Sequence, residues 1–239
     1  MHRRFSTAAW SVLAAAAVLI CANAGARAAS FTLVTSQAGL GANDFIDWGQ
    51  LGPDDSFAAN PSPVTSSLGS SFTLSKTQSD DFTRFDQLGC CGLVAPPPVA
   101  SGDHLIMTND QGNNANSIIV AGSMYAAGSL VFAVAQGDFI ARITAYDSIG
   151  DVLASFIVNG STNPSGYGTG LAPFLGIVSD APFAKVGFSL DSATGDTAYL
   201  GIDTLFLRTT PAPEPESLAL LGLGVAGLLL VTRRQRTGA

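Results

Sequence analysis

The chain has 239 residues, of which 47% are apolar and only 12% are charged, and its formal net charge is −7. This apolar content excludes an intrinsically disordered chain, because it is enough to support a folded core. The length fits one sizeable domain with addressing segments. We expect that arrangement, since much of the apolar content lies at the two ends.

Residues 1–28 have the order of a secretory signal peptide. A basic start at positions 2–4 is followed by an apolar stretch from Ala8 to Cys21, which is too short to span a bilayer comfortably. Small-residue cleavage patterns end at Ala26 and at Ala28, and the sequence does not separate these two sites. A buried or amphipathic N-terminal helix would be the alternative, but no polar face is visible. We therefore predict that the protein is exported.

Residues 29–208 form the predicted ectodomain, which is strongly acidic. Two of the 18 acids, Glu214 and Glu216, lie in the tail, so this domain has 16 acids, all Asp, against five basic residues. Its formal charge is therefore about −11 (5 − 16). Nothing offsets repulsion from phosphates, so we expect no binding to nucleic acid.

The composition of the ectodomain favours strands and turns over helices. Glu is absent and Lys is rare, which argues against surface helices, while Asp, Asn, Gly and Ser favour turns. A hairpin is predicted from a strand at 139–146, a turn at 147–151 and a strand at 152–158 that ends at Asn159-Gly160. Further strands are expected at 71–75, 104–108, 117–120, 129–135, 185–190 and 199–207. We predict an all-β fold, an antiparallel β-sandwich of jelly-roll-like type.

The mature chain keeps two adjacent cysteines, Cys90 and Cys91, because Cys21 leaves with the leader. Export favours oxidation. Their α-carbons are only about 3.8 Å apart, which is below the usual disulfide range, so a vicinal bridge would be strained. The flanking glycines allow unusual backbone angles. A vicinal disulfide, intermolecular pairing and two free thiols all remain open, with the first slightly favoured.

Catalytic patterns are scarce. His104 is the only histidine of the mature chain, and neither G-x-S-x-G nor H-E-x-x-H occurs. The chain also lacks a usual set of zinc ligands. We expect a structural or surface role for His104, no catalytic residue and no enzymatic activity.

Paired carboxylates leave one enzymatic alternative open. Glycosidases need only two acids, and Asp54-Asp55, Asp80-Asp81 and the nearby Asp44 and Asp47 are candidates. Neighbouring acids in a sequence are more often solvated residues of turns. Trp48 is the single Trp of the domain available to stack on sugars. An extracellular, glycosidase-like hydrolase with an unrecognised acidic site therefore stays as the alternative function.

No cofactor is predicted, although structural calcium is left open. Calcium takes oxygen ligands from loops, and the best local candidate is the polar loop from Asn109 to Asn114. It lacks the EF-hand spacing, and an ordinary polar loop is the preferred interpretation. Asp203 differs from the other acids because it lies in an apolar strand; we expect it to cap a loop or to form a hydrogen bond at an edge.

The last 31 residues form a three-part tail. The linker at 209–217 contains Pro213, Glu214 and Pro215, and the apolar segment 218–232 follows. The segment 233–239 is basic, with Arg233, Arg234 and Arg236. The apolar run is shorter than the roughly 20 residues of a usual membrane span, but arginines can snorkel and rescue a short span. The positive-inside rule then leaves the C-terminus in the cytoplasm and the domain outside.

This tail resembles the PEP-CTERM sorting signal of Gram-negative bacteria, with Ala212 standing where that family often has Val. The resemblance implies processing by an exosortase, a membrane-embedded protease or transpeptidase. It also implies an inner-membrane intermediate, followed by the cell surface or the extracellular matrix. Such proteins usually occur with exopolysaccharide production and biofilm matrix.

The ectodomain resembles, less specifically, β-sandwich domains that often precede this tail. Matching stretches lie at 102–109, 141–147, 174–177 and 201–205. That resemblance implies the sandwich fold and no activity. We expect a non-enzymatic surface or matrix protein, with exopolysaccharide as a possible partner. Sugar binding usually needs exposed aromatic side chains, for which the candidates are Trp48, Tyr125, Tyr146, Tyr167 and Tyr199.

Overall fold

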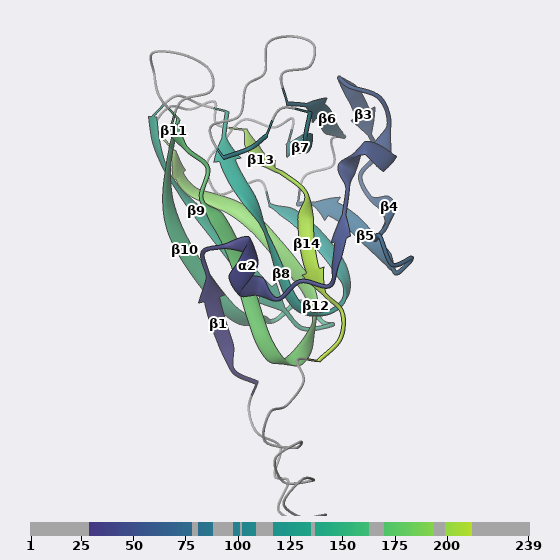
Figure 1. The fold of residues 1–239 in the computed structure, drawn as a ribbon, viewed down its shortest axis with the longest axis vertical. Helices are drawn as coiled ribbons and strands as arrows, with labels where there is room; N and C mark the ends of the chain where they lie inside the picture. Colours follow the sequence, from purple (N-terminus) through teal and green to yellow (C-terminus); the bar gives the residue numbers. More distant parts are fainter. Residues whose placement is uncertain are drawn as a thin grey trace, which may run out of the picture. The chain divides into compact units, whose positions relative to one another are not determined.

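A computed structural model gives the fold of this chain, and Figure 1 shows it as a ribbon. It describes residues 29–77, 81–87, 98–100, 102–108, 117–134, 137–162, 170–193 and 199–211. The predicted signal peptide at 1–28, the membrane segment at 218–232 and the basic tail at 233–239 lie outside these residues. Within the part that is described, no helix has the length and hydropathy needed to cross a membrane.

Most described residues of the compact unit that begins at Phe31 lie in strands. The first half contains β1 (Phe31–Val34), α2 (Gln37–Leu40), β2 (Asp44–Ile46), the 3-10 helix η1 (Trp48–Leu51), β3 (Ser56–Ala58), β4 (Ser62–Thr65), β5 (Ser71–Lys76) and β6 (Phe82–Asp86). The second half contains β7 (His104–Thr108), β8 (Ile118–Ala133), β9 (Gly137–Tyr146), β10 (Val152–Thr162), β11 (Gly170–Leu171), β12 (Phe174–Ala193), β13 (Leu200–Ile202) and β14 (Leu205–Arg208). Their pairings are antiparallel, which confirms the mostly-β antiparallel class.

Strand β8 is the hub of the hydrogen-bonded network. It pairs with β12, β5, β14 and β13 along different parts of its length. The main path through the strands runs β11-β10-β9-β12-β8-β13-β7-β6-β3. A large apolar cluster contains side chains from strands on both sides of β8 in this path, including Phe82 on β6 and Phe188 on β12. All the described strands are joined in one hydrogen-bonded network and are not divided into two separate sheets. The jelly-roll-like sandwich therefore remains a prediction.

The prediction of two separate strands at 117–120 and 129–135 was wrong. One strand, β8, runs through the small residues between them. The neighbouring backbone explains the composition at this point: a Cβ added to Gly128 would lie 2.8 Å from the α-carbon of Gly176 on β12. Small residues here permit close approach of the two strands.

The β9–β10 hairpin is confirmed, with Asp147 holding the turn. Its Oδ1 accepts hydrogen bonds from the backbone N–H groups of Ile149, Gly150 and Asp151. The predicted end of the second strand at Asn159-Gly160 was wrong, because β10 continues to Thr162. Gly160 lies opposite Phe139, whose ring occupies the space that a Cβ would need. This glycine therefore belongs to the sheet and not to a turn.

The predicted last strand at 199–207 is two strands. β13 pairs with β7 and β8, and β14 pairs with β2 and another part of β8. The chain changes partners at Asp203 and Thr204, which belong to neither strand. The acidic residue Asp203, which stands in an otherwise apolar stretch of sequence, therefore lies at the break between the two strands.

Candidate functional site

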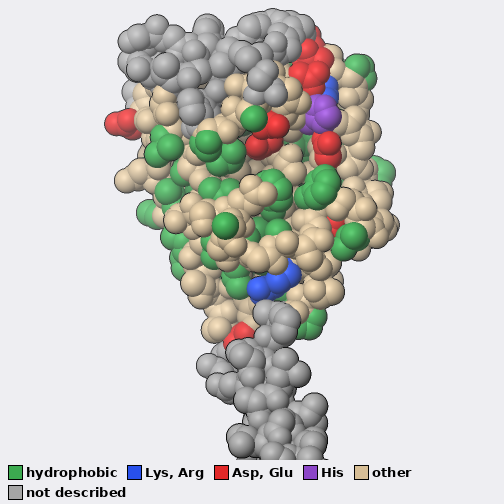
Figure 2. Space-filling model, in the orientation of Figure 1, with side chains coloured by type: hydrophobic (Ala, Val, Ile, Leu, Met, Phe, Trp, Pro, Cys, Tyr) green, Lys and Arg blue, Asp and Glu red, His purple; other side chains and the backbone are tan. Residues whose placement is uncertain are grey.

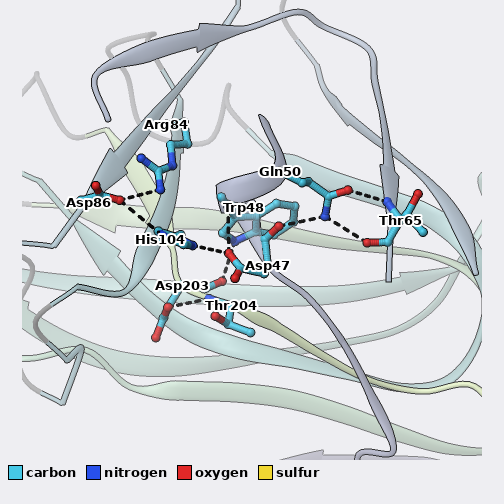
Figure 3. Close-up of polar contacts among 10 residues, drawn as sticks. Asp47, Trp48, Gln50, Thr65, Arg84, Asp86, His104, Asp203 and Thr204 are labelled. Carbon is cyan, nitrogen blue, oxygen red and sulfur yellow. Dashed lines mark hydrogen bonds and ion pairs between the residues drawn. The ribbon is translucent and has the colours of Figure 1, made fainter. Parts of the chain in front are cut away.

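The segment after β2 ties two polar regions to the core. Asp47 caps η1 through a hydrogen bond from the Gly49 backbone N–H to its Oδ1, at 2.8 Å. Trp48 follows and is fully buried, and its Nε1–H donates to the backbone oxygen of Asp203 at 2.8 Å. In Figure 3 the Asp47 carboxylate lies beside His104, and the Trp48 indole lies next to Asp47. One short stretch of chain thus fixes the positions of both regions.

One of these two polar regions surrounds His104. We call it the His104 network, and it consists of Asp47, Arg84, Asp86 and His104. The Nδ1 of His104 lies 2.5 Å from Oδ1 of Asp47, and its Nε2 lies 3.7 Å from Oδ1 of Asp86. Arg84 pairs with the same Asp86 oxygen at 2.5 Å. Both ring nitrogens of the histidine therefore face carboxylates. Neither nitrogen is directed at a serine hydroxyl, as a Ser-His-Asp arrangement requires.

Asp47 and Asp44 are stabilised in their charged forms. Burial raises the pKa of Asp47, but the hydrogen bonds from Gly49 and His104 outweigh this effect and hold the pKa below its ordinary value. Burial also raises the pKa of Asp44, and hydrogen bonds from Ser66, Ser67 and the Leu68 backbone again lower it overall. These two acids, a candidate pair in the sequence, serve separate hydrogen-bonded structures.

Asp203 has the opposite electrostatic character. The residue is only 5% exposed, and burial raises the pKa of its carboxyl to about 6. Repulsion from the charges of Asp103 and Asp47 adds to the increase, while the Thr204 backbone N–H, which donates to Oδ1 at 2.6 Å, opposes it. The other carboxylate oxygen points away from the His104 network (Figure 3). Asp203 was expected within an apolar strand, but it lies in the break between β13 and β14, where its carboxylate accepts the hydrogen bond from Thr204.

A cavity of about 740 Å³, which we call the Asp203 hollow, is lined by Asp203. Its lining includes Asp103 and Asp203, apolar side chains from β8, β12 and β14, and the polar residues Ser36, Gln37 and Asn159. Among the lining residues that the structure describes, none is Lys, Arg or His. On the face in Figure 2, acidic side chains gather beside the histidine, with apolar ones below them. The size and lining fit a small ligand or one segment of a polymer.

The structure separates the other sequence candidates. Asp54 accepts a hydrogen bond from the Asp86 backbone, and Asp55 adopts a positive φ of 57° in a turn. Asp81 presents its backbone oxygen to Lys76, and Asp80 lies outside the described residues. Across the described ranges, no group of three or more His, Cys, Asp or Glu is arranged to hold a metal ion.

The aromatic candidates do not form an exposed platform in the described ranges. Trp48 is in the core, and Tyr125, Tyr146 and Tyr199 are half-buried. Several calls on the sequence fall outside the described residues: Tyr167, the Cys90 and Cys91 pair, the Asn109–Asn114 loop, the motif Pro213, Glu214 and Pro215, and the arginines Arg233, Arg234 and Arg236. The vicinal disulfide and the calcium loop stay predictions.

Residues 211–235 match the family model described as the PEP-CTERM protein-sorting motif. The chain carries a PEP-CTERM sorting motif. This match confirms the resemblance that rested on the three-part tail. The PEP-CTERM motif implies export, processing by an exosortase and sorting to the cell surface. It covers only the tail, so it says nothing about what the β domain binds.

Solved structures that resemble this chain do so weakly. A DUF4465 family protein from Bacteroides caccae is 13% identical, with a TM-score of 0.38; the match covers 75% of this chain and 100% of that one. The module CsCBM6-3 from Clostridium stercorarium, solved in complex with cellobiose, is 11% identical, with a TM-score of 0.28; the match covers 49% of this chain and 81% of that one. The enzymatically active domain of tailspike protein 4 from Bacteriophage CBA120 is 17% identical, with a TM-score of 0.30; the match covers 57% of this chain and 19% of that one. No curated protein matches the sequence.

Proposed function

We propose that this chain is an exported, exosortase-processed protein of the cell surface or extracellular matrix, whose β domain binds exopolysaccharide without catalysing a reaction. The observation that carries the proposal is the PEP-CTERM motif at 211–235. The strongly acidic ectodomain supports solubility outside the cell. We further propose that this domain is a β-sandwich of the jelly-roll-like type.

The proposed route has three steps. The signal peptide at 1–28 directs export, and the apolar segment 218–232 holds an intermediate in the inner membrane. The exosortase then cuts near the Pro-Glu-Pro motif, and the domain reaches the surface or matrix. The arginines after the apolar segment support this orientation, because positive charge favours the cytoplasmic side.

Two features of the described residues support binding over catalysis. The only histidine of the mature chain has both ring nitrogens facing carboxylates, which suits a fixed structural contact better than proton transfer to a substrate. The Asp203 hollow also offers a concave surface with apolar walls and a few polar groups, which is the usual character of a ligand site.

A glycosidase-like hydrolase is the second candidate, and one observation favours it. Asp203, with a pKa of about 6, shares the hollow with Asp103, and glycosidases combine an acid of raised pKa with a second carboxylate. Release of reducing ends from a matrix polysaccharide, lost in Asp203→Asn, would establish this candidate. Binding with no such release would exclude it for that polysaccharide.

Mass spectrometry of the protein from envelope and medium fractions tests the sorting proposal, using strains with and without the exosortase. We expect a product that begins near Ala29 and ends between Pro213 and Ser217, and that is absent without the enzyme. A protein that retains Leu218–Ala239 in both strains would overturn the proposal and leave a membrane-tethered ectodomain.

A further inference from the structure

The Asp203 hollow has an uncompensated negative charge. Asp103 and Asp203 both line it, whereas no basic side chain does among the described lining residues. Most basic side chains of the described residues have partners elsewhere: Arg84 with Asp86, Arg142 with Asp191, Arg208 with the Ser179 backbone, and Lys76 with the Asp81 backbone. The buried Asp203 carboxylate is also shielded from much of the water that would otherwise stabilise its charge. A positively charged ligand would therefore balance the negative charge of the hollow.

The lining favours an organic cation over a metal ion. Calcium usually takes six to eight oxygen ligands, and the described residues contain no cluster of three acids that could begin such a set. One wall is apolar, with Leu130, Phe174 and Phe206, and the two rings lie 6.4 Å apart between centroids. A hydrated metal ion gains little from such a wall. An ammonium group attached to a body with an apolar face fits both parts of the hollow.

We propose that the Asp203 hollow binds an amino-sugar unit that carries a free primary ammonium, with the Asp203 carboxylate as the acceptor. This inference rests on the proposed function, which supplies a polysaccharide as the ligand. The apolar C–H face of the sugar packs on Phe174 and Phe206, and its hydroxyls meet the polar rim at Ser36, Gln37 and Asn159. The rim distinguishes a sugar from a lysine side chain, whose body has no hydroxyls to bind there.

This assignment predicts selectivity among matrix polysaccharides. An N-acetylated sugar presents no positive charge to Asp203, although it has the same ring. A uronic acid brings a second negative charge into a hollow that already has two, and the formal charge of the ectodomain repels it further. Partly or fully de-acetylated amino-sugar polymers are therefore the expected class.

Calorimetric titration of the mature protein, purified from the producing strain, tests the inference. The probes are glucosamine oligomers, N-acetylglucosamine oligomers of the same length, uronate oligomers and oligolysine, at a pH of about 6.5 and low salt. We expect glucosamine oligomers to bind most tightly. Asp203→Asn should weaken that binding about 10- to 100-fold, since a charged hydrogen bond is replaced by a neutral one.

Asp151→Asn is the matched control. It removes the same charge from an exposed position in the β9–β10 turn, outside the lining of the hollow. We expect this variant to bind glucosamine oligomers as the unchanged protein does. An equal loss in both variants would show that the net charge of the domain, and not the Asp203 hollow, attracts the ligand, and would overturn the assignment.

The other outcomes are equally decisive. Equal binding of acetylated and free amino sugars, preference for uronates, or no binding of any sugar would contradict the inference. Equal binding of oligolysine would contradict the assignment to a sugar. These results are separable from failure of the sorting proposal, because mass spectrometry reports the tail independently and titration can be made on either form of the protein.

Discussion

The His104 network and the Asp203 hollow lie on two sides of one short segment, and they treat negative charge in opposite ways. In the network, Asp47 receives hydrogen bonds from Gly49 and His104, and its pKa is lowered. In the hollow, Asp203 is buried and is repelled by the charges of Asp103 and Asp47, and its pKa is raised to about 6. The contrast shows that Asp44, Asp47 and Asp147 accept hydrogen bonds that hold turns and caps, whereas Asp203 destabilises the fold when it is ionised.

The largest expected effect comes from removing the connection between the two regions. Trp48→Ala deletes a fully buried indole and its hydrogen bond to the Asp203 backbone. We expect a loss of about 3–5 kcal/mol in the free energy of unfolding, measured by urea denaturation. Trp48→Phe, which retains most of the packing, should lose about 1–2 kcal/mol. Equal stability of both variants and the unchanged protein would contradict the position of Trp48 in the core.

Asp203→Asn should increase stability at neutral pH. The pKa of Asp203 is about 6 in the folded protein and near its ordinary value of 3.8 when unfolded, so the folded state binds the proton more tightly. Stability from this group is complete below about pH 4 and is lost as the pH rises through 6. The variant, which keeps an acceptor for the Thr204 N–H, should exceed the unchanged protein by about 2–3 kcal/mol above pH 7.

The measurement for Asp203→Asn is urea denaturation across this pH range, in which the difference should vanish near pH 4. The neighbouring charges that help to raise the pKa are those of Asp103 and Asp47, so Asp103→Asn should give a smaller gain of the same sign. A variant that is less stable than the unchanged protein at neutral pH would contradict the assigned burial.

Gly49→Ala is expected to disturb the His104 network by a smaller amount. An added Cβ would lie 2.4 Å from Nδ1 of His104, which is held between Asp47 and Asp86. We expect a loss of about 1–2 kcal/mol, by the same denaturation assay. In the His104→Ala background this cost should largely disappear. A cost that is the same in both backgrounds would place its origin in the backbone of η1.

Asp47→Asn should have the smallest effect and the opposite pH dependence to Asp203→Asn. The lowered pKa of Asp47 means that its contribution is present above the unfolded value of 3.8 and is lost as the pH falls through the folded value. Its side chain is 49% exposed, so the loss at neutral pH should stay below about 1 kcal/mol. A gain in stability at neutral pH would contradict the contrast between the two regions.

The sequence predicted the antiparallel β class and the β9–β10 hairpin because alternation and turn residues are local signals. The predicted strand boundaries were wrong where a glycine is required by a residue far away in the sequence. Gly128 allows the β12 backbone to come close, and Gly160 lies under the ring of Phe139. Asp203 was recognised as unusual within an apolar run, but the break between β13 and β14 follows from a change of strand partners. The approach of His104 to Asp47, across 57 positions, has no local signal at all.

The contrast between the two regions is tested most directly by titrating individual carboxylates with carbon-detected NMR of the mature protein. The account predicts a midpoint near pH 6 for Asp203 and one below 3.8 for Asp47 in the same sample. Binding of glucosamine oligomers should then lower the Asp203 midpoint and leave that of Asp47 in place. Midpoints that coincide, or that occur in the reverse order, would contradict the account.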